Sequence, residues 1–148
     1  MADITRIEAL HLNVIESLVS QSTQEGFQFL QRLVDDWAAG RNRFDRDGEG
    51  LFIAQVDRQV VGIGGLNRDP YASDEIIGRL RHLYILPTHR RQGIGRLLVH
   101  HIVAFARPHY QLIRLRTDTA AAASFYAELG FHAANQSDAT HVFALAGS

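Results

Sequence analysis

The stretch Arg90-Arg91-Gln92-Gly93-Ile94-Gly95 decides the fold, because it predicts an anion-binding turn between a strand and a helix. An apolar segment at residues 76–86 precedes the turn and ends at Pro87, and an apolar stripe at helical spacing follows it. The first turn of a helix carries backbone N–H groups without intrahelical partners and the positive end of the helix dipole. Glycine at positions 93 and 95 leaves the backbone accessible to a phosphate group. We therefore expect an anionic ligand at this junction.

The charge distribution around the turn supports this expectation. Residues 76–117 contain no acidic residue and carry eight arginines, although the net charge of the chain is only −1. Such a segment favours an anionic partner, although a solvated basic face is commoner for an arbitrary Arg-rich stretch. All 15 basic residues are arginine, which excludes a Schiff-base lysine and the Gly-Lys-Ser/Thr phosphate loop. Leu98 stands where a dinucleotide fingerprint requires its third glycine, so that motif is disfavoured.

The segments before the turn predict a short edge strand, two amphipathic helices and a run of strands. Apolar residues first repeat at helical spacing and then alternate, which is the change of period expected between helix and strand. Two of the strands are separated by a tight connection and form a hairpin. The expected elements are a strand at residues 4–7, helices at 12–19 and 30–37, and strands at 51–56, 60–66 and 76–86.

The segments after the turn predict two more helices and three strands. Pro108 ends the first helix, Asp118 or Thr119 caps the second, and Gly130 stops it. The expected strands lie at residues 112–116, 131–133 and 141–145. This order of elements predicts an α/β (α+β) fold with a mixed, mostly antiparallel central sheet and helices on both faces.

Length and composition indicate one domain spanning residues 1–148. With 46% hydrophobic and 21% charged residues, the chain has the composition of a soluble globular protein. The absence of cysteine excludes disulfides, thiolate nucleophiles and Cys-ligated zinc. The N-terminus is charged and no apolar stretch is long enough to cross a membrane, so we expect a cytoplasmic protein with no membrane partner.

A second group of residues with catalytic character lies at residues 119–131. Phe125 and Leu129 are four residues apart and can be buried together on one face of a helix. Tyr126 projects about 100° around the helix, one turn beyond the small Ala122. A tyrosine beside a groove lined by alanine can act as a general acid, although a half-buried tyrosine without such a role is commoner. By itself this pattern is a weak signal.

The motifs taken together resemble a known family of enzymes. Leu83-Tyr84-Ile85-Leu86-Pro87, Arg90-x-x-Gly93-x-Gly95 and Phe125-Tyr126-x-x-x-Gly130-Phe131 occur in this order after a predicted hairpin. This arrangement resembles the GNAT superfamily of acetyl-CoA-dependent N-acetyltransferases, and the resemblance covers residues 51–148. It implies direct transfer of an acetyl group from acetyl-CoA to a primary amine of a small molecule or a peptide, with no protein nucleophile and no metal.

The resemblance also implies roles for individual residues. The strand at 83–85 would offer backbone groups to the pantetheine arm, the turn would hold the CoA pyrophosphate, and Tyr126 would protonate the departing thiolate. His82 is the nearest candidate for a general base, although strand alternation directs it away from the cleft. The residues expected to contact acetyl-CoA are Leu83, Tyr84, Ile85, Arg90, Arg91, Gln92, Gly93, Ile94, Gly95, Arg96, Thr119, Ala122 and Phe125.

Two arginines depart from the family pattern. Arg79 and Arg114 stand where many relatives carry a glutamate that deprotonates the amine. They predict an electropositive cleft and an acceptor amine that also carries a carboxylate or phosphate. The alternative is that one or both arginines point outward and bind nothing, and that the acidic N-terminal half, with residues such as Asp74 and Glu75, attracts a cationic acceptor.

Other classes of function remain open at this stage. A catalytically silent domain that senses acyl-CoA fits the missing glutamates, and a nucleic-acid-binding module would use the arginines but has few aromatic residues among them. A purely structural interaction domain is a further alternative. His100-His101 lacks the spacing and the carboxylate of a metal site. We therefore expect no nucleic acid and no metal, while a homodimer is compatible with the resemblance because dimers are frequent in the family.

Overall fold

The computed structural model describes residues 2–73 and 76–145, in which a seven-stranded sheet is packed between two pairs of helices. The strands lie in the order β1-β2-β3-β4-β5-β7-β6, and only β4 and β5 are parallel neighbours within the described residues. The strands are β1 (Asp3–Ile7), β2 (Gly50–Val56), β3 (Gln59–Arg68), β4 (Ile77–Ile85), β5 (Leu112–Leu115), β6 (His132–Ala133) and β7 (His141–Ala144). The helices are α1 (Leu12–Gln24), α2 (Phe29–Ala38), the 3₁₀ turn η1 (Pro87–His89), α3 (Ile94–Ala106) and α4 (Ala120–Glu128).

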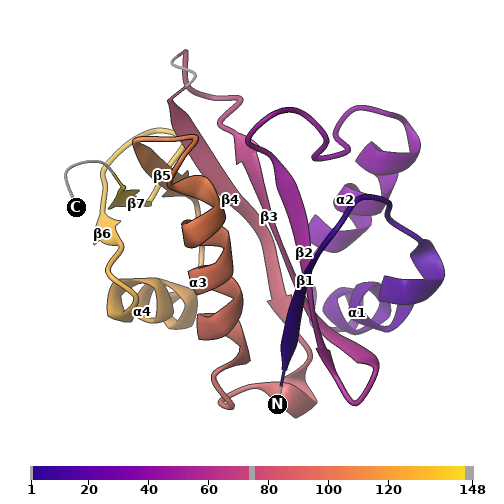
Figure 1. Cartoon of the computed structure of the whole chain (residues 1–148). Coiled ribbons are helices and arrows are strands. Elements are labelled where there is room, and N and C mark those ends of the chain that lie inside the picture. The colour runs from indigo at the N-terminus through magenta and orange to yellow at the C-terminus, as the bar shows by residue number, and fades with distance from the viewer. Residues whose placement is uncertain (1, 74–75, 146–148) are drawn as a thin grey trace.

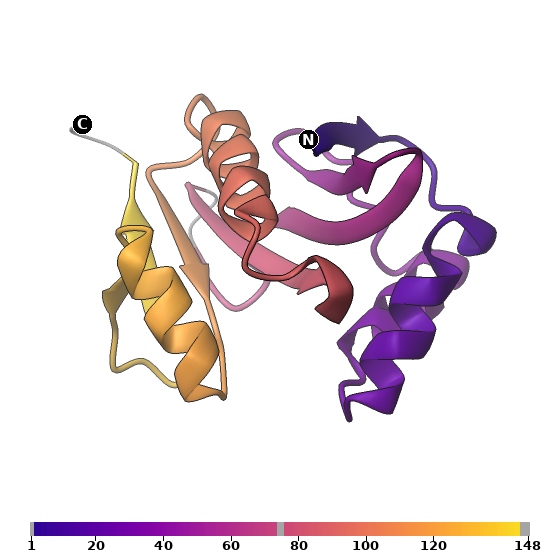
Figure 2. The same cartoon turned by 90° about the horizontal axis from the view of Figure 1, so that it is seen from below.

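Each face of the sheet is covered by its own helix pair, with α1 and α2 on one side and α3 and α4 on the other (Figure 1). The first side buries Ile15, Leu18 and Leu30 against the sheet. The second side buries Leu98 and Ile102. Each such fully buried leucine or isoleucine contributes roughly 1.5–3 kcal/mol, so the two cores hold the sheet from both faces. Figure 2 shows the sheet passing between the two helix pairs. The predicted fold class is confirmed.

A bulge interrupts β4 at the centre of the molecule. Ile63 pairs with Tyr84 and Gly65 pairs with Arg81, so the single residue Gly64 opposes both His82 and Leu83. His82 takes a left-handed backbone conformation with φ of 61°. A bulge bends its strand and increases the local twist. The C-terminal half of β4 is therefore turned relative to its neighbours.

The bulge accompanies an opening between β4 and β5. Along the described residues, these strands pair only from Ile77–Arg79 to Leu112–Arg114. The β4 residues after Arg79 therefore present a backbone edge that β5 does not cover. This opening lies at the carboxyl ends of two parallel strands, where open α/β sheets bind ligands.

Several element boundaries differ from those expected from sequence. β3 continues to Arg68 and α1 to Gln24, beyond the stretches with clear periodicity. α3 ends at Ala106 with Arg107 as its C-cap, because Pro108 has no backbone N–H to continue the helical hydrogen bonds. Thr119 is the cap of α4, since its hydroxyl accepts from the Ala122 N–H at 3.1 Å. No helix within residues 2–73 and 76–145 combines the length and the apolar character needed to cross a membrane.

Candidate functional site

A cleft of about 1100 Å³ occupies the opening beside β4. Its wall is formed by the α1–α2 connection, the second half of β4, the start of α3, the end of β5 and one face of α4. Every predicted site residue except Gln92 lines this cleft. Gln92 lies at a smaller hollow of about 620 Å³ that shares Gly93, Ile94 and Arg96 with the cleft. The two hollows thus meet at the turn that the sequence indicated.

The turn presents an uncapped helix N-terminus to both hollows. Gly93 is the N-cap of α3 with φ of 80°, and no side chain caps the first turn. Arg91 is also left-handed, with φ of 64°. Such turns direct successive backbone N–H groups toward one point and bind anions. Arg91 and Arg96 have exposed side chains and no ion-pair partner among the described residues, so their charge adds to that of the helix dipole.

The two glycines of the turn serve different purposes. A Cβ at Gly93 would meet no atom within 4 Å, so this position faces open space. A Cβ at Gly95 would lie 3.3 Å from Cζ of Phe125. Gly95 therefore allows α3 to approach α4. This helix packing explains the glycine at position 95 without a ligand close to it.

Arg90 is held by protein groups. Its guanidinium donates to both carboxylate oxygens of Glu25 at 2.8 and 2.9 Å, and its Nε donates to the Ile85 carbonyl at 2.9 Å. The Tyr84 hydroxyl also donates to Glu25. The hydrogen bond from Arg90 lowers the pKa of Glu25. This cluster ties the end of α1 to the turn. Glu25 lies 65 residues from Arg90 in sequence, and no motif around Glu25 predicts this contact.

The edge of β4 supplies backbone groups to the cleft. The Leu86 N–H bonds to Val61 on β3 at 2.8 Å. Because backbone groups of successive strand residues point to opposite sides, those of Ile85 point away from β3. The Ile85 carbonyl accepts a hydrogen bond from Nε of Arg90. The N–H of Ile85 faces the same side as that carbonyl, toward the opening beside β5.

Tyr126 lies on the wall of the cleft opposite this edge. Its side chain packs against Phe125 and Phe131, with ring centroids 5.1 and 5.4 Å away. Among the described residues its hydroxyl has no hydrogen-bond partner, and burial raises the pKa of this hydroxyl. Tyr126 therefore stays protonated at neutral pH and has a proton to donate.

His82 lies on the wall of the cleft nearest α2 because the bulge rotates it there. Its ring lies 6.5 Å from that of Phe29 and 6.0 Å from that of Phe44. The side chain is partly exposed, but its Nδ1 atom is buried and has no hydrogen-bond partner among the described residues. Burial lowers the pKa of His82 to about 3. The ring is neutral at physiological pH, and such a low pKa makes it a weak base.

The expectation that Arg79 and Arg114 make the cleft electropositive is wrong. Both side chains are buried, and both approach the fully buried carboxylate of Asp69, at 3.6 and 2.7 Å. Arg114 also pairs with Asp138 at 2.9 Å, while Arg79 donates to the Asp138 backbone carbonyl at 2.8 Å. These partners neutralise the two charges and leave no donor pair for an acceptor. Asp74 and Glu75, the alternative acceptor contacts, lie outside the described residues.

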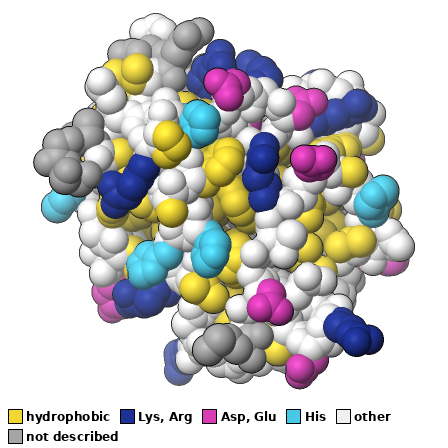
Figure 3. Space-filling model, in the orientation of Figure 1, with side chains coloured by type: hydrophobic (Ala, Val, Ile, Leu, Met, Phe, Trp, Pro, Cys, Tyr) yellow, Lys and Arg dark blue, Asp and Glu magenta, His cyan; other side chains and the backbone are white. Residues whose placement is uncertain are grey.

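Across residues 2–73 and 76–145, no three His, Asp or Glu side chains come together as metal ligands. On the face seen in Figure 3, arginines are interspersed with carboxylates and hydrophobic side chains. This distribution differs from the continuous basic surface typical of nucleic-acid-binding proteins.

Comparison with known proteins identifies the family. Residues 47–133 match the model of the acetyltransferase (GNAT) domain. N-acetyltransferase 8 of Homo sapiens is 35% identical over 94 residues, which cover 61% of this chain and 41% of the human protein. The chain thus matches less than half the length of that relative. A candidate acetyltransferase from Exiguobacterium sp. 255-15 is 30% identical with a TM-score of 0.87, covering 97% of this chain and 93% of the other.

A further structural neighbour shows the fold with its ligands. N-acetylglutamate synthase from Neisseria gonorrhoeae, solved with coenzyme A and N-acetyl-glutamate, has a TM-score of 0.71 over 98% of this chain and 35% of its own, at 16% identity. The family match covers the hairpin, the bulged strand, the turn and all of α4. The chain belongs to the GNAT family of acetyltransferases.

Proposed function

We propose that this chain transfers an acetyl group from acetyl-CoA to a primary amine of a small molecule or a peptide. One observation carries the proposal. The open edge of β4, the uncapped start of α3 and the protonated Tyr126 all face one cleft. These are the three features that an extended thioester with a pyrophosphate and a thiol leaving group requires.

The donor fits the cleft from the turn inward. The pyrophosphate would take the N–H groups at the start of α3, with Arg91 and Arg96 beside them. The pantetheine arm would run along β4 as an additional strand-like segment and bond to the exposed backbone edge. The thioester would then lie between the bulge and Tyr126.

The chemistry is a direct displacement. The amine nitrogen attacks the thioester carbonyl, the C–N bond forms, and the C–S bond breaks as the tetrahedral intermediate collapses. A backbone N–H of β4, such as that of Ile85, would stabilise the oxyanion. Tyr126 would then donate its proton to the CoA thiolate, while water in the cleft removes the proton that the amine loses. With its low pKa, His82 fits the role of a neutral hydrogen-bonding group better than that of a base.

Transfer assays with an amine panel test the proposal. We expect acetyl-CoA to bind saturably, and free CoA thiol to appear together with an equal amount of acetylated amine. Binding without turnover on any amine would favour the sensor domain instead. Failure to bind acetyl-CoA would contradict both functions.

A further inference from the structure

The part of the cleft that faces α1 and α2 carries positively charged side chains. Arg32 and Arg81 line it, and neither has an ion-pair partner within residues 2–73 and 76–145. Of the carboxylates nearby, Glu25 pairs with Arg90, Asp36 pairs with Arg41 at 2.9 Å, and Asp35 accepts from the Gln31 amide at 3.0 Å. This contrasts with Arg79 and Arg114, whose charges are neutralised inside the protein.

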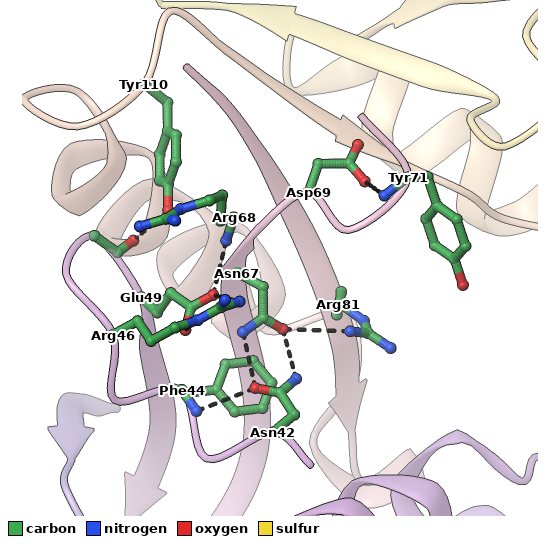
Figure 4. A network of polar contacts seen from close by, with 11 residues as sticks. Asn42, Phe44, Arg46, Glu49, Asn67, Arg68, Asp69, Tyr71, Arg81 and Tyr110 are labelled. Carbon is green, nitrogen blue, oxygen red and sulfur yellow. Dashed lines mark hydrogen bonds and ion pairs between the residues drawn. The ribbon is translucent and has the colours of Figure 1, made fainter. Parts of the chain in front are cut away.

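The Arg81 guanidinium is oriented through neutral groups. Its Nη1 donates to the Asn67 amide oxygen at 3.4 Å. Asn67 and Asn42 exchange amide hydrogen bonds of 2.8 and 3.0 Å, and Asn42 also accepts from the Phe44 N–H. In Figure 4 the other end of the guanidinium points away from this network. The arginine thus contacts a neutral amide on one side, which leaves its charge available to a ligand.

An apolar wall lies beside these arginines. Phe27 and Phe29 both line the cleft, with ring centroids 5.5 Å apart, and Phe29 in turn lies against His82. The charges of Arg81 and Arg32 add to burial in lowering the pKa of His82, which places both arginines near its ring. Because burial keeps the His82 ring neutral, it adds no charge to those of the two arginines.

We propose that the acceptor is an amine that also carries an anionic oxygen group, a carboxylate or a phosphonate, and an apolar substituent. The anionic group binds Arg81 and Arg32, and the apolar substituent packs on Phe27 and Phe29. The amine then points toward the thioester beside the β4 bulge. This inference rests on the proposed acetyl transfer and specifies its acceptor.

Three amines of one shape test the inference: L-phenylalanine, its α-aminophosphonate analogue and 2-phenylethylamine, which lacks the acid. With acetyl-CoA saturating, we expect kcat/KM for the two acidic amines to exceed that for 2-phenylethylamine by about 10-fold or more, the usual value of a charge-assisted contact. Arg81→Gln and Arg32→Gln should each reduce this preference, and the double variant should abolish it. Arg58→Gln, at the exposed β2–β3 turn, is the matched control and should keep the preference.

The outcomes separate this inference from the function on which it rests. Arg32 is exposed, so Arg32→Gln is a variant that keeps the fold if Arg81→Gln unfolds, and thermal unfolding monitors both. Equal kcat/KM for the three amines, a preference that survives the double variant, or polyamines as the best acceptors would overturn the inference and leave acetyl transfer standing. Binding of acetyl-CoA with no transfer to the acidic amines would also overturn it. Absence of acetyl-CoA binding would instead remove the proposed function itself.

Discussion

Tyr126 combines a tightly packed ring with a hydroxyl that no described side chain binds. Its ring is packed among Phe125 and Phe131, which fixes its orientation, and its hydroxyl has no partner among the described residues. The hydroxyl is not sealed in the core, because Tyr126 lines the cleft, where a ligand can accept a hydrogen bond from it. Burial of the side chain also raises the pKa of the hydroxyl, so it is protonated at neutral pH.

Replacing Tyr126 with Phe tests this role because it removes the proton and keeps the ring. We expect kcat to fall by roughly 100-fold or more if proton transfer limits turnover, with little change in the Kd for acetyl-CoA. Steady-state kinetics and calorimetric titration of the same preparation measure both quantities. An unchanged kcat and pH profile would remove Tyr126 from the mechanism.

Gly93 is the residue of the turn whose side-chain space is open. In Gly93→Ala, the new methyl group meets no protein atom but lies in the space proposed for the pyrophosphate. The left-handed backbone adds strain of about 1 kcal/mol. We expect the KM for acetyl-CoA to rise by about 10-fold or more, because close approach to the backbone N–H groups is lost.

Gly40→Ala separates strain from ligand blockage. Gly40 also has a positive φ, of 75°, but it lies after α2 and outside the cleft. Both variants should lose a similar amount of thermal stability, and only Gly93→Ala should weaken donor binding. Equal donor affinities in the two variants would show that the open space beside Gly93 is not the phosphate site.

His82 makes the stability of the protein depend on pH in a defined window. Its pKa is lowered from 6.5 to about 3 by burial, so between these values the unfolded chain binds a proton that the folded chain does not. The free energy of unfolding therefore falls as the pH is lowered from about 6.5 toward 3. In His82→Asn, whose side chain tolerates a positive φ, this dependence should be shallower.

Chemical denaturation at several pH values measures the effect, with exposed His132→Asn as the control. Parallel curves for the wild type and His82→Asn would contradict the low pKa. The acid limb of the kcat/KM profile should stay in place in His82→Asn, since a group with a pKa of about 3 does not titrate near neutral pH.

Among the elements, the Glu25–Arg90 pair connects the end of α1 with the turn before α3 across the cleft. Glu25 lies after α1, and Arg90 begins the turn before α3. The pair is partly exposed, with side-chain accessibilities of 24% and 41%, so its contribution to stability is modest, about 0.2–1 kcal/mol. Its larger effect is geometric, because it holds Arg90 on the Ile85 carbonyl, beside the position that we propose for the thioester.

Glu25→Gln should therefore change kinetics more than stability. We expect a KM increase for both acetyl-CoA and the amine, and non-additive effects when Glu25→Gln is combined with Arg90→Gln. Arg41→Gln breaks the comparable surface pair with Asp36 and should alter stability alone. Additive effects on KM in the double variant would show that the two residues act independently.

The elements themselves could largely be predicted from the sequence, because apolar periodicity, Pro87, Thr119 and Gly130 are local signals. The ion-pair partners that side chains find on other strands could not be predicted in this way. Asp69 neutralises Arg79 and Arg114 from the far end of β3, and nothing near those arginines in sequence indicates it. The bulge at His82 was also missed, since strand alternation assumes a regular strand and directed this side chain away from the cleft.

In the whole molecule, one central sheet supports both helix pairs, and its strands β4 and β5 are paired along only part of their length. Two independent cores hold its faces, and the opening between β4 and β5 lies between the two helix pairs. The proposed donor site consists of local motifs, which is why the sequence alone indicated it. The proposed acceptor side consists of α1, α2 and the loops after them, whose residues come together only in the folded chain. A single domain over residues 1–148 remains a prediction.

The central claim is that acetyl-CoA binds along the open edge of β4 with its pyrophosphate at the start of α3. Titration of the isotope-labelled protein with acetyl-CoA, followed by amide NMR shifts, tests it directly. We expect saturable chemical-shift changes at the N–H groups of Ile94, Gly95 and Arg96 and at those of Leu83 and Ile85 on β4. The changes on β1 and β2 should be smaller. No saturable shift, or shifts confined to residues outside this turn and strand edge, would contradict it.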